Sequence, residues 1–204
     1  MSRYIFIRHG ESTANREGWL SGHADVPLTE RGERQAIEAA PALGEYQVKW
    51  AFSSDLRRAA RTAELLLLDS PLQARPSRAL RERSCGSDQG DSLRTVEESG
   101  RIQQYYTLDG YPPQGESLRA VAIRAMGFLA EHETPGDCTL VVAHGGLIRV
   151  VVGLIDELPP AEFCRWKPQN CELIVRELAS GYWVTMRQHL IDHQPTRSQA
   201  HGPG

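Results

Sequence analysis

The sequence lacks long apolar segments, and no apolar run approaches the roughly 20 residues that a helix needs to span a membrane. Its first residues also lack the charged, apolar and small-residue order of a signal peptide. Both absences argue against a membrane-bound or exported protein. The sequence therefore predicts a cytoplasmic protein with no membrane partner.

Positive charge is not in excess either. The formal net charge is −3 and the sequence pI is close to 6.2, whereas nucleic acids and anionic membranes bind basic surfaces. We therefore expect no nucleic-acid partner, although this balance still allows a local basic pocket.

Cysteine is scarce, with four residues whose spacing fits no metal site: Cys85, Cys138, Cys164 and Cys171. In a reducing cytosol they are expected to be free thiols. The sequence also has no internal repeat at solenoid periods and no linker-like segment. Nothing in the pattern therefore divides the chain into separate units.

The 204 residues, of which 40% are hydrophobic, suffice for one well-covered domain. We assign residues 1–193 to a single domain with a cap excursion at about 83–113. The polar residues 194–204 are expected to form a disordered tail. The sequence leaves the oligomeric state open, with a homodimer as one alternative.

Two short apolar runs end in the same dipeptide, His-Gly. The first covers Tyr4–Ile7 and continues into Arg8 and His9, and the second covers residues 138–143 and continues into His144. Both runs are typical of buried strands. Because ligands bind beyond the carboxyl ends of strands in open α/β sheets, we expect one site built from both ends of the chain.

The remaining pattern alternates helices and strands, which indicates an α/β domain. Helices are expected at 29–44, 55–68, 115–132 and 145–154, with a cap helix at about 96–108 and a further strand at 48–53. Residues 172–177 and 182–187 are interpreted as a β-hairpin that turns at Ser180 and Gly181.

Five residues at or near the ends of the expected strands could form one site. They supply two guanidiniums, two imidazoles and a carboxyl group: Arg8, Arg58, His9, His144 and Glu82. If they converge they form an anion pocket, because the rigid fork of arginine matches phosphate. The backbone N–H groups of Gly10 and Gly145 would add to it, the latter at a helix start.

This set suits phosphoryl transfer. An imidazole that nearby arginines keep neutral can attack phosphorus and form a phosphohistidine. Glu82 would protonate the leaving oxygen and later take a proton from the attacking water. Positioning and charge stabilisation dominate such reactions, so no metal is needed if the arginines supply the charge.

The motifs around these residues occur in a recognisable order over residues 4 to about 150. They are Arg8-His9-Gly10-Glu11-Ser12 with Asn15, Pro27-Leu28-Thr29-Glu30-Arg31-Gly32, Ser53-Ser54-Asp55-Leu56-Arg57-Arg58-Ala59, Leu80-Arg81-Glu82, Gly115-Glu116-Ser117 and Ala143-His144-Gly145-Gly146. This series resembles the histidine phosphatase superfamily, also called phosphoglycerate mutase-like. The resemblance implies a three-layer α/β/α sandwich with a mostly parallel six-stranded sheet.

The resemblance also implies a role for each matched residue. His9 corresponds to the phosphorylated nucleophile and Glu82 to the proton donor, and Arg8, Arg58 and His144 correspond to the phosphate clamp. Four further positions would contact the substrate: Asn15, Ser21, Gly22 and Gly145. No cofactor and no metal are implied, and the expected partner is a small phosphorylated metabolite.

The resemblance leaves the reaction open. Many family members carry Glu-Gly where this chain has Gln89-Gly90, and no Arg-Arg pair lies between Glu82 and Gly115 to hold the carboxylate of phosphoglycerate. These departures favour a metal-independent phosphatase, with α-ribazole phosphatases as a loosely fitting group. The alternatives are a phosphoglycerate mutase and a non-catalytic binding relative.

Overall fold

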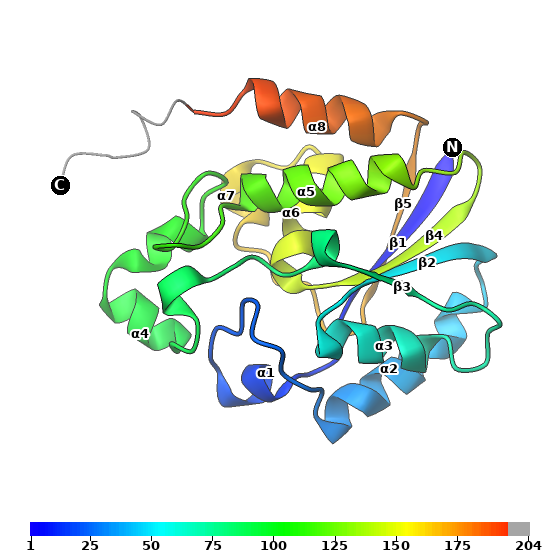
Figure 1. Ribbon diagram of the computed structural model, residues 1–204, viewed down its shortest axis with the longest axis horizontal. Coiled ribbons are helices and arrows are strands. Elements are labelled where there is room, and N and C mark those ends of the chain that lie inside the picture. Colours follow the sequence, from blue (N-terminus) through cyan, green and yellow to red (C-terminus); the bar gives the residue numbers. More distant parts are fainter. Residues whose placement is uncertain (196–204) are drawn as a thin grey trace.

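A computed structural model describes residues 1–195 of the chain, so the expected tail from residue 196 onward lies outside the described residues. The elements can be followed in Figure 1. The strands are β1 (Ser2–Arg8), β2 (Val48–Ser54), β3 (Arg75–Ser77), β4 (Cys138–Ala143) and β5 (Leu173–Leu178). The helices are α1 (Thr13–Glu17), α2 (Glu30–Leu43), α3 (Arg57–Leu66), α4 (Leu93–Glu98), α5 (Leu118–Glu131), α6 (Gly145–Ile155), α7 (Pro160–Phe163) and α8 (Tyr182–Asp192), with 3₁₀ turns η1 (Arg78–Leu80), η2 (Gly86–Asp88) and η3 (Arg101–Tyr105).

The strands form one mixed sheet in the order β3-β2-β4-β1-β5. β1 runs parallel to β4, and β4, β2 and β3 follow in parallel, whereas β5 pairs antiparallel with β1 at one edge. The mostly parallel α/β fold predicted from the sequence is therefore confirmed. Within residues 1–195 the sheet has five strands rather than the six that the resemblance implied.

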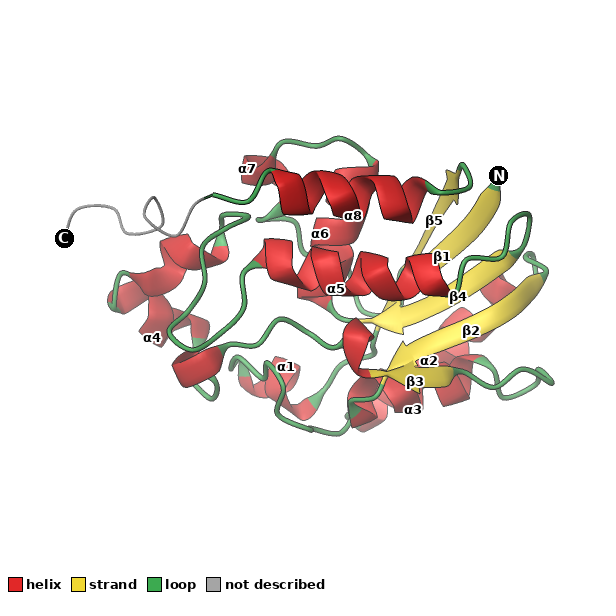
Figure 2. Ribbon diagram, turned by 45° about the horizontal axis from the view of Figure 1, so that its top comes forward, coloured by secondary structure: helices red, strands yellow, loops and turns green. Residues whose placement is uncertain are grey.

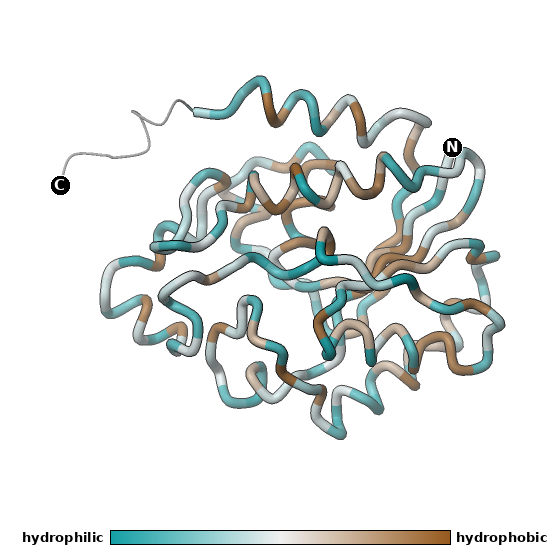
Figure 3. Tube along the Cα trace, in the orientation of Figure 1, coloured by the Kyte–Doolittle hydropathy of each residue, from teal (hydrophilic) through white to brown (hydrophobic). Residues whose placement is uncertain are grey.

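Helices cover both faces of the sheet, as Figure 2 shows. Alternate side chains of a strand point to opposite faces. In β1, Tyr4 and Phe6 enter the core under α5, α6 and α8, while Ile5 and Ile7 enter the core under α2 and α3. β1 is thus buried on both sides, which explains its unbroken apolar run. Figure 3 shows this hydrophobic stretch where the strands run together.

The β-hairpin expected at the C-terminal end is wrong in its second half. Residues 172–177 do belong to a strand, but Tyr182–Asp192 form helix α8 after Gly181, whose φ is 80°. Trp183, Met186 and Leu190 recur at helical spacing and pack into the core under α5. This spacing predicts a helix, but the turn residues Ser180 and Gly181 favoured the hairpin interpretation.

Other departures are local. The expected cap helix at 96–108 consists of two short pieces, α4 and η3, which Gly100 separates with a φ of 74°. The sequence interpretation also missed three short elements, α1, β3 and α7. Each has seven residues or fewer, too short for a periodic pattern to reveal.

The segment 83–113 leaves the sheet and forms its own small core of Cys85, Val96, Ile102 and Tyr105. Arg83 ties this segment to the body: its Nε donates to the carbonyl of Glu116, and its Nη2 donates to the carbonyls of Gln104 and Gly110.

None of the helices in residues 1–195 combines the length and apolar content needed to cross a bilayer.

The packing of α8 gives a direct test of the fold. Trp183 is fully buried and meets the ring of Tyr4 edge-on, with 4.9 Å between ring centroids. We expect Trp183→Ala to lower the free energy of unfolding by about 3–5 kcal/mol, because it leaves a large cavity. The neighbouring exposed residue supplies the control, Val184→Ala, which should change it by less than about 0.5 kcal/mol. Equal urea midpoints for the two variants would contradict this docking of α8.

Candidate active site

Parallel pairing of β1 with β4 brings the two predicted histidines together. Arg8 lies opposite Ala143 in the register, and the backbone N–H of His9 donates to the carbonyl of Ala143 at 3.0 Å. His9 and His144 therefore follow their strands at the same level of the sheet. Their ring centroids are 5.1 Å apart, so two residues separated by most of the chain share one site.

Two glycines explain why the motifs at 8–12 and 27–32 occur together. A Cβ atom on Gly10 would lie 2.3 Å from the carbonyl oxygen of Gly32, and one on Gly32 would lie 2.1 Å from that of Glu11. The loop after β1 and the first turn of α2 thus pack backbone against backbone, which only glycine permits at these points. This contact sets the path of the chain immediately after His9.

The hydrogen bond of the His9 ring defines its tautomer. Nδ1 lies 2.7 Å from the carbonyl oxygen of Gly10, and because a carbonyl can only accept, Nδ1 carries the hydrogen. The lone pair of Nε2 remains free. Both ring nitrogens of His144 are buried with no hydrogen-bond partner among residues 1–195. They are therefore available to a ligand.

Both imidazoles are held in the neutral form. Burial lowers the pKa of His9 well below its usual range, and the positive charges of Arg58 and Arg8 lower it further. Burial likewise lowers the pKa of His144, and the charge of Arg58 adds to the effect. A neutral ring is the form that can attack an electrophile or accept a proton.

The two arginines beside the histidines have N–H groups without a hydrogen-bond acceptor in the described chain. Arg58 is fully buried, and its Nη1 and Nη2 donate to the carbonyls of Ala24 and Gly22 at 2.8 and 2.9 Å. Arg8 donates from Nη1 to the carbonyl of Pro168 at 2.8 Å. In the described chain neither arginine has a carboxylate hydrogen-bonded to it, and the Nε of each is buried without a partner. An anion entering here would satisfy both.

Glu82 lies on the same site. Its two carboxylate oxygens accept from the backbone N–H groups of Arg83 at 2.7 Å and of Gly146 at 3.0 Å. Gly146 is in the first turn of α6, directly after His144 and Gly145. The carboxyl group therefore faces the helix N-terminus at which an anion would bind, and it is within reach of an oxygen attached to that anion.

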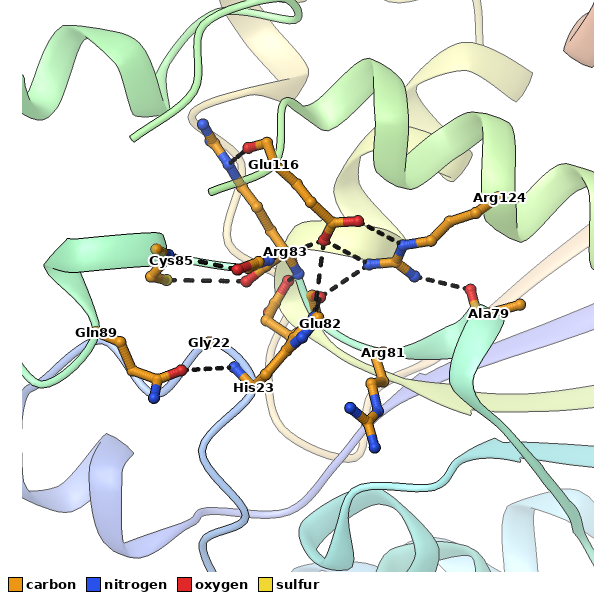
Figure 4. A network of polar contacts seen from close by, with 12 residues as sticks. Gly22, His23, Ala79, Arg81, Glu82, Arg83, Cys85, Gln89, Glu116 and Arg124 are labelled. Atoms are coloured by element: carbon orange, nitrogen blue, oxygen red, sulfur yellow. Dashed lines mark hydrogen bonds and ion pairs between the residues drawn. The ribbon is translucent and has the colours of Figure 1, made fainter. Parts of the chain in front are cut away.

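Three residues outside the predicted set hold the backbone of residues 82–84, as Figure 4 shows. Arg124 and the ring of His23 each donate to the carbonyl of Glu82 at 2.8 Å. Glu116 accepts from Arg124 and from the backbone N–H of Ser84. His23 thus connects the loop at 21–28 to Glu82. Glu116, assigned to a helix start, lies just before the cap residue of α5 and positions this segment.

These groups border a cavity of about 270 Å³. Its wall includes all four residues predicted to contact substrate, Asn15, Ser21, Gly22 and Gly145, together with Arg8 and Glu82. His9, Arg58 and His144 do not line this cavity but are buried behind its wall: His9 follows Arg8, His144 precedes Gly145, and Arg58 donates to the carbonyl of Gly22. All nine predicted site residues are therefore brought together around one cavity.

The sequence interpretation missed the outer part of the wall, which includes Trp19, Tyr106, Arg149, Trp166 and Lys167. No motif marks these residues, and they come from separate loops and from the second turn of α6. Among residues 1–195 no three His, Cys, Asp or Glu side chains are placed to share a metal ion. The four cysteines are buried free thiols, as expected.

Comparison with known proteins identifies the family of this chain. Residues 4–190 match the family described as histidine phosphatase superfamily (branch 1). The chain belongs to this superfamily. The 2,3-bisphosphoglycerate-dependent phosphoglycerate mutase 2 of Gloeobacter violaceus is 34% identical over 182 residues, which cover 84% of this chain and 83% of the relative.

The solved structures of similar fold include phosphatases. A mycobacterial glucosyl-3-phosphoglycerate phosphatase in complex with VO3 has a TM-score of 0.78 and 31% identity, covering 85% of this chain and 91% of its own. The α-ribazole phosphatase from Shigella flexneri has a TM-score of 0.73 and 26% identity, covering 87% and 91%. The relatives thus include both mutases and phosphatases.

The neutral state of His144 predicts how stability depends on pH. In the unfolded chain its imidazole binds a proton near pH 6.5, whereas the buried ring does not, so stability falls as the pH drops below about 6.5. We expect His144→Gln to reduce this fall by up to about 1.4 kcal/mol per pH unit. Urea unfolding at about pH 7.5 and 5.5 measures this change in the free energy of unfolding. His193→Gln, at an exposed position, is the control, and an unchanged slope in His144→Gln would contradict a buried neutral ring.

Proposed function

We propose that this protein is a metal-independent phosphomonoesterase that acts on a small phosphorylated metabolite through a phosphohistidine at His9. The observation that carries the proposal is the placement of a neutral imidazole, with its hydrogen on Nδ1, beside buried Arg58 and half-buried Arg8, to which no carboxylate of residues 1–195 is hydrogen-bonded. Such a pocket binds a phosphoryl group and offers it a nucleophile at the same time.

The geometry divides the reaction into two steps. In the first, Nε2 of His9 attacks phosphorus, the bond to the leaving oxygen breaks, and Glu82 supplies the proton to that oxygen. In the second, Glu82 takes a proton from a water molecule, which attacks phosphorus and releases phosphate from His9. Arg8, Arg58 and neutral His144 stabilise the charge on the phosphoryl oxygens in both steps, and the start of α6 adds its N–H groups.

Chelation and substitution test this mechanism together. Wild-type protein should release phosphate from members of a phosphomonoester panel with EDTA present, because the arginines supply the charge that a metal would. His9→Ala should lose at least about 10³-fold in kcat, and His193→Ala, at an exposed site, should keep wild-type activity. Brief reaction with ³²P-labelled substrate should leave an acid-labile, base-stable label only where His9 is present.

Strict dependence on added metal would refute the metal-independent mechanism. Unchanged hydrolysis by His9→Ala would refute the phosphohistidine. The panel should include α-ribazole phosphate, sugar phosphates and phosphoserine, since the similar phosphatases act on different organic groups and the outer cavity wall decides among them.

The similarity to a phosphoglycerate mutase supports a second candidate reaction, phosphoryl transfer within the substrate class. A mutase hands the phosphoryl group from phosphohistidine back to the substrate instead of to water. It would interconvert 2- and 3-phosphoglycerate in the presence of a bisphosphorylated primer and release little free phosphate. Measuring both products in one reaction separates the two activities. A non-catalytic role is the least supported, because every proposed catalytic group is present and in reach.

A further inference from the structure

Arg149 differs from every other half-buried or buried arginine in the described part of the chain. Within residues 1–195 it makes no hydrogen bond and no ion pair, and its Nε is buried without a partner. The other buried and half-buried arginines have acceptors: Arg119 and Arg124 donate to carboxylates, and Arg58 donates to backbone carbonyls. A buried donor without an acceptor is costly, and such a group often marks a place where a ligand completes the site.

Arg149 reaches the cavity from α6. Its Cα lies five residues beyond His144, about 7.5 Å along the helix axis at 1.5 Å per residue, and helical side chains lean back toward the N-terminus. It therefore lines the wall beyond the phosphate pocket, with Arg8 and Arg83 in the same wall. Burial lowers the pKa of both of those arginines, and the charge of Arg149 contributes to the lowering.

The cavity wall carries more positive charge than one phosphate pocket accounts for. Besides Arg8 and Arg149 it includes Arg83 and the exposed Lys167, and its only carboxylate is Glu82. Both oxygens of Glu82 already accept backbone N–H groups. No acidic side chain in the wall is therefore free to balance Arg149 and Lys167.

We propose that Arg149, with Lys167 at the rim, binds a second anionic group on the organic part of the substrate. The inference rests on the proposed function and narrows its substrate class to phosphomonoesters that carry a further carboxylate or phosphate. Apolar side chains of the outer wall, Leu93, Ile102, Tyr106 and Trp166, contact the atoms between the two anions. The nearest alternative is that Arg149 supplements the clamp on the transferred phosphate.

Matched pairs of compounds separate these roles. 3-Phosphoglycerate and glycerol 3-phosphate differ by one carboxylate, and fructose 1,6-bisphosphate and fructose 6-phosphate differ by one phosphate. The variant is Arg149→Met, which keeps an unbranched apolar stem and removes the charged guanidinium. Arg165→Met is the matched control, because Arg165 is exposed and stacks on Tyr106 with 4.6 Å to the ring centroid but is not part of the wall.

We expect Arg149→Met to lower kcat/KM at least about tenfold more for the doubly anionic member of a pair than for its partner, as loss of a charged hydrogen bond does. If selectivity is lost within the first pair, the second anionic group that Arg149 binds is a carboxylate. If it is lost within the second pair, that group is a phosphate. Arg165→Met should leave both ratios unchanged. Equal losses on both members of both pairs would overturn the proposal and place Arg149 on the transferred phosphate.

Binding provides a readout that does not depend on turnover. Calorimetry with the same four compounds on His9→Ala, with and without Arg149→Met, should show the same change in the ratio of Kd values. Failure of wild-type protein to hydrolyse any phosphomonoester would refute the phosphatase, while the Kd ratios would still decide the subsite. Should Arg149→Met fail to fold, Arg149→Lys tests the fork geometry with the charge retained.

Discussion

The site depends on the parallel pairing of β1 with β4. This pairing aligns Arg8 with Ala143, so that the residues following each strand, His9 and His144, emerge at the same height. β1 is held in place by core contacts on both faces and by β5 on its other side. A one-residue slip would turn every side chain of β1 to the opposite face, so the hydrophobic core maintains the alignment of the two imidazoles.

Burial of positive charge is the second constraint on the site. Arg58 and Arg8 have carbonyl oxygens as their only hydrogen-bond acceptors among the described residues. Burying a charge that no carboxylate pairs with directly is unfavourable. Burial lowers the pKa of both histidines, and the arginine charge lowers it further, so the charge that favours an anion in the pocket also favours neutral imidazoles.

The carboxyl group of Glu82 is positioned through its backbone. Arg124 comes from α5, Glu116 lies just before the cap residue of α5, and His23 comes from the loop at 21–28. These three side chains hold residues 82–84 by hydrogen bonds to main-chain atoms. Segments on both sides of the cavity thus meet at Glu82. The same loop also receives the two terminal donors of Arg58, which couples the phosphate pocket to the position of the carboxyl group.

The sequence alone determined most of the fold, and it singled out nine residues that the structure brings together at the inner site. Buried strands, long amphipathic helices and histidines at strand ends leave local patterns, because each depends on neighbours a few residues away. Helix α8 was misread, since the turn at Ser180 and Gly181 suits a hairpin as well as a helix start and only the core under α5 selects the helix. Tertiary structure also decided the outer wall, where Arg149 and Lys167 face one cavity from distant segments. Whether a side chain lacks a partner depends on everything packed around it, and no stretch of sequence contains that information.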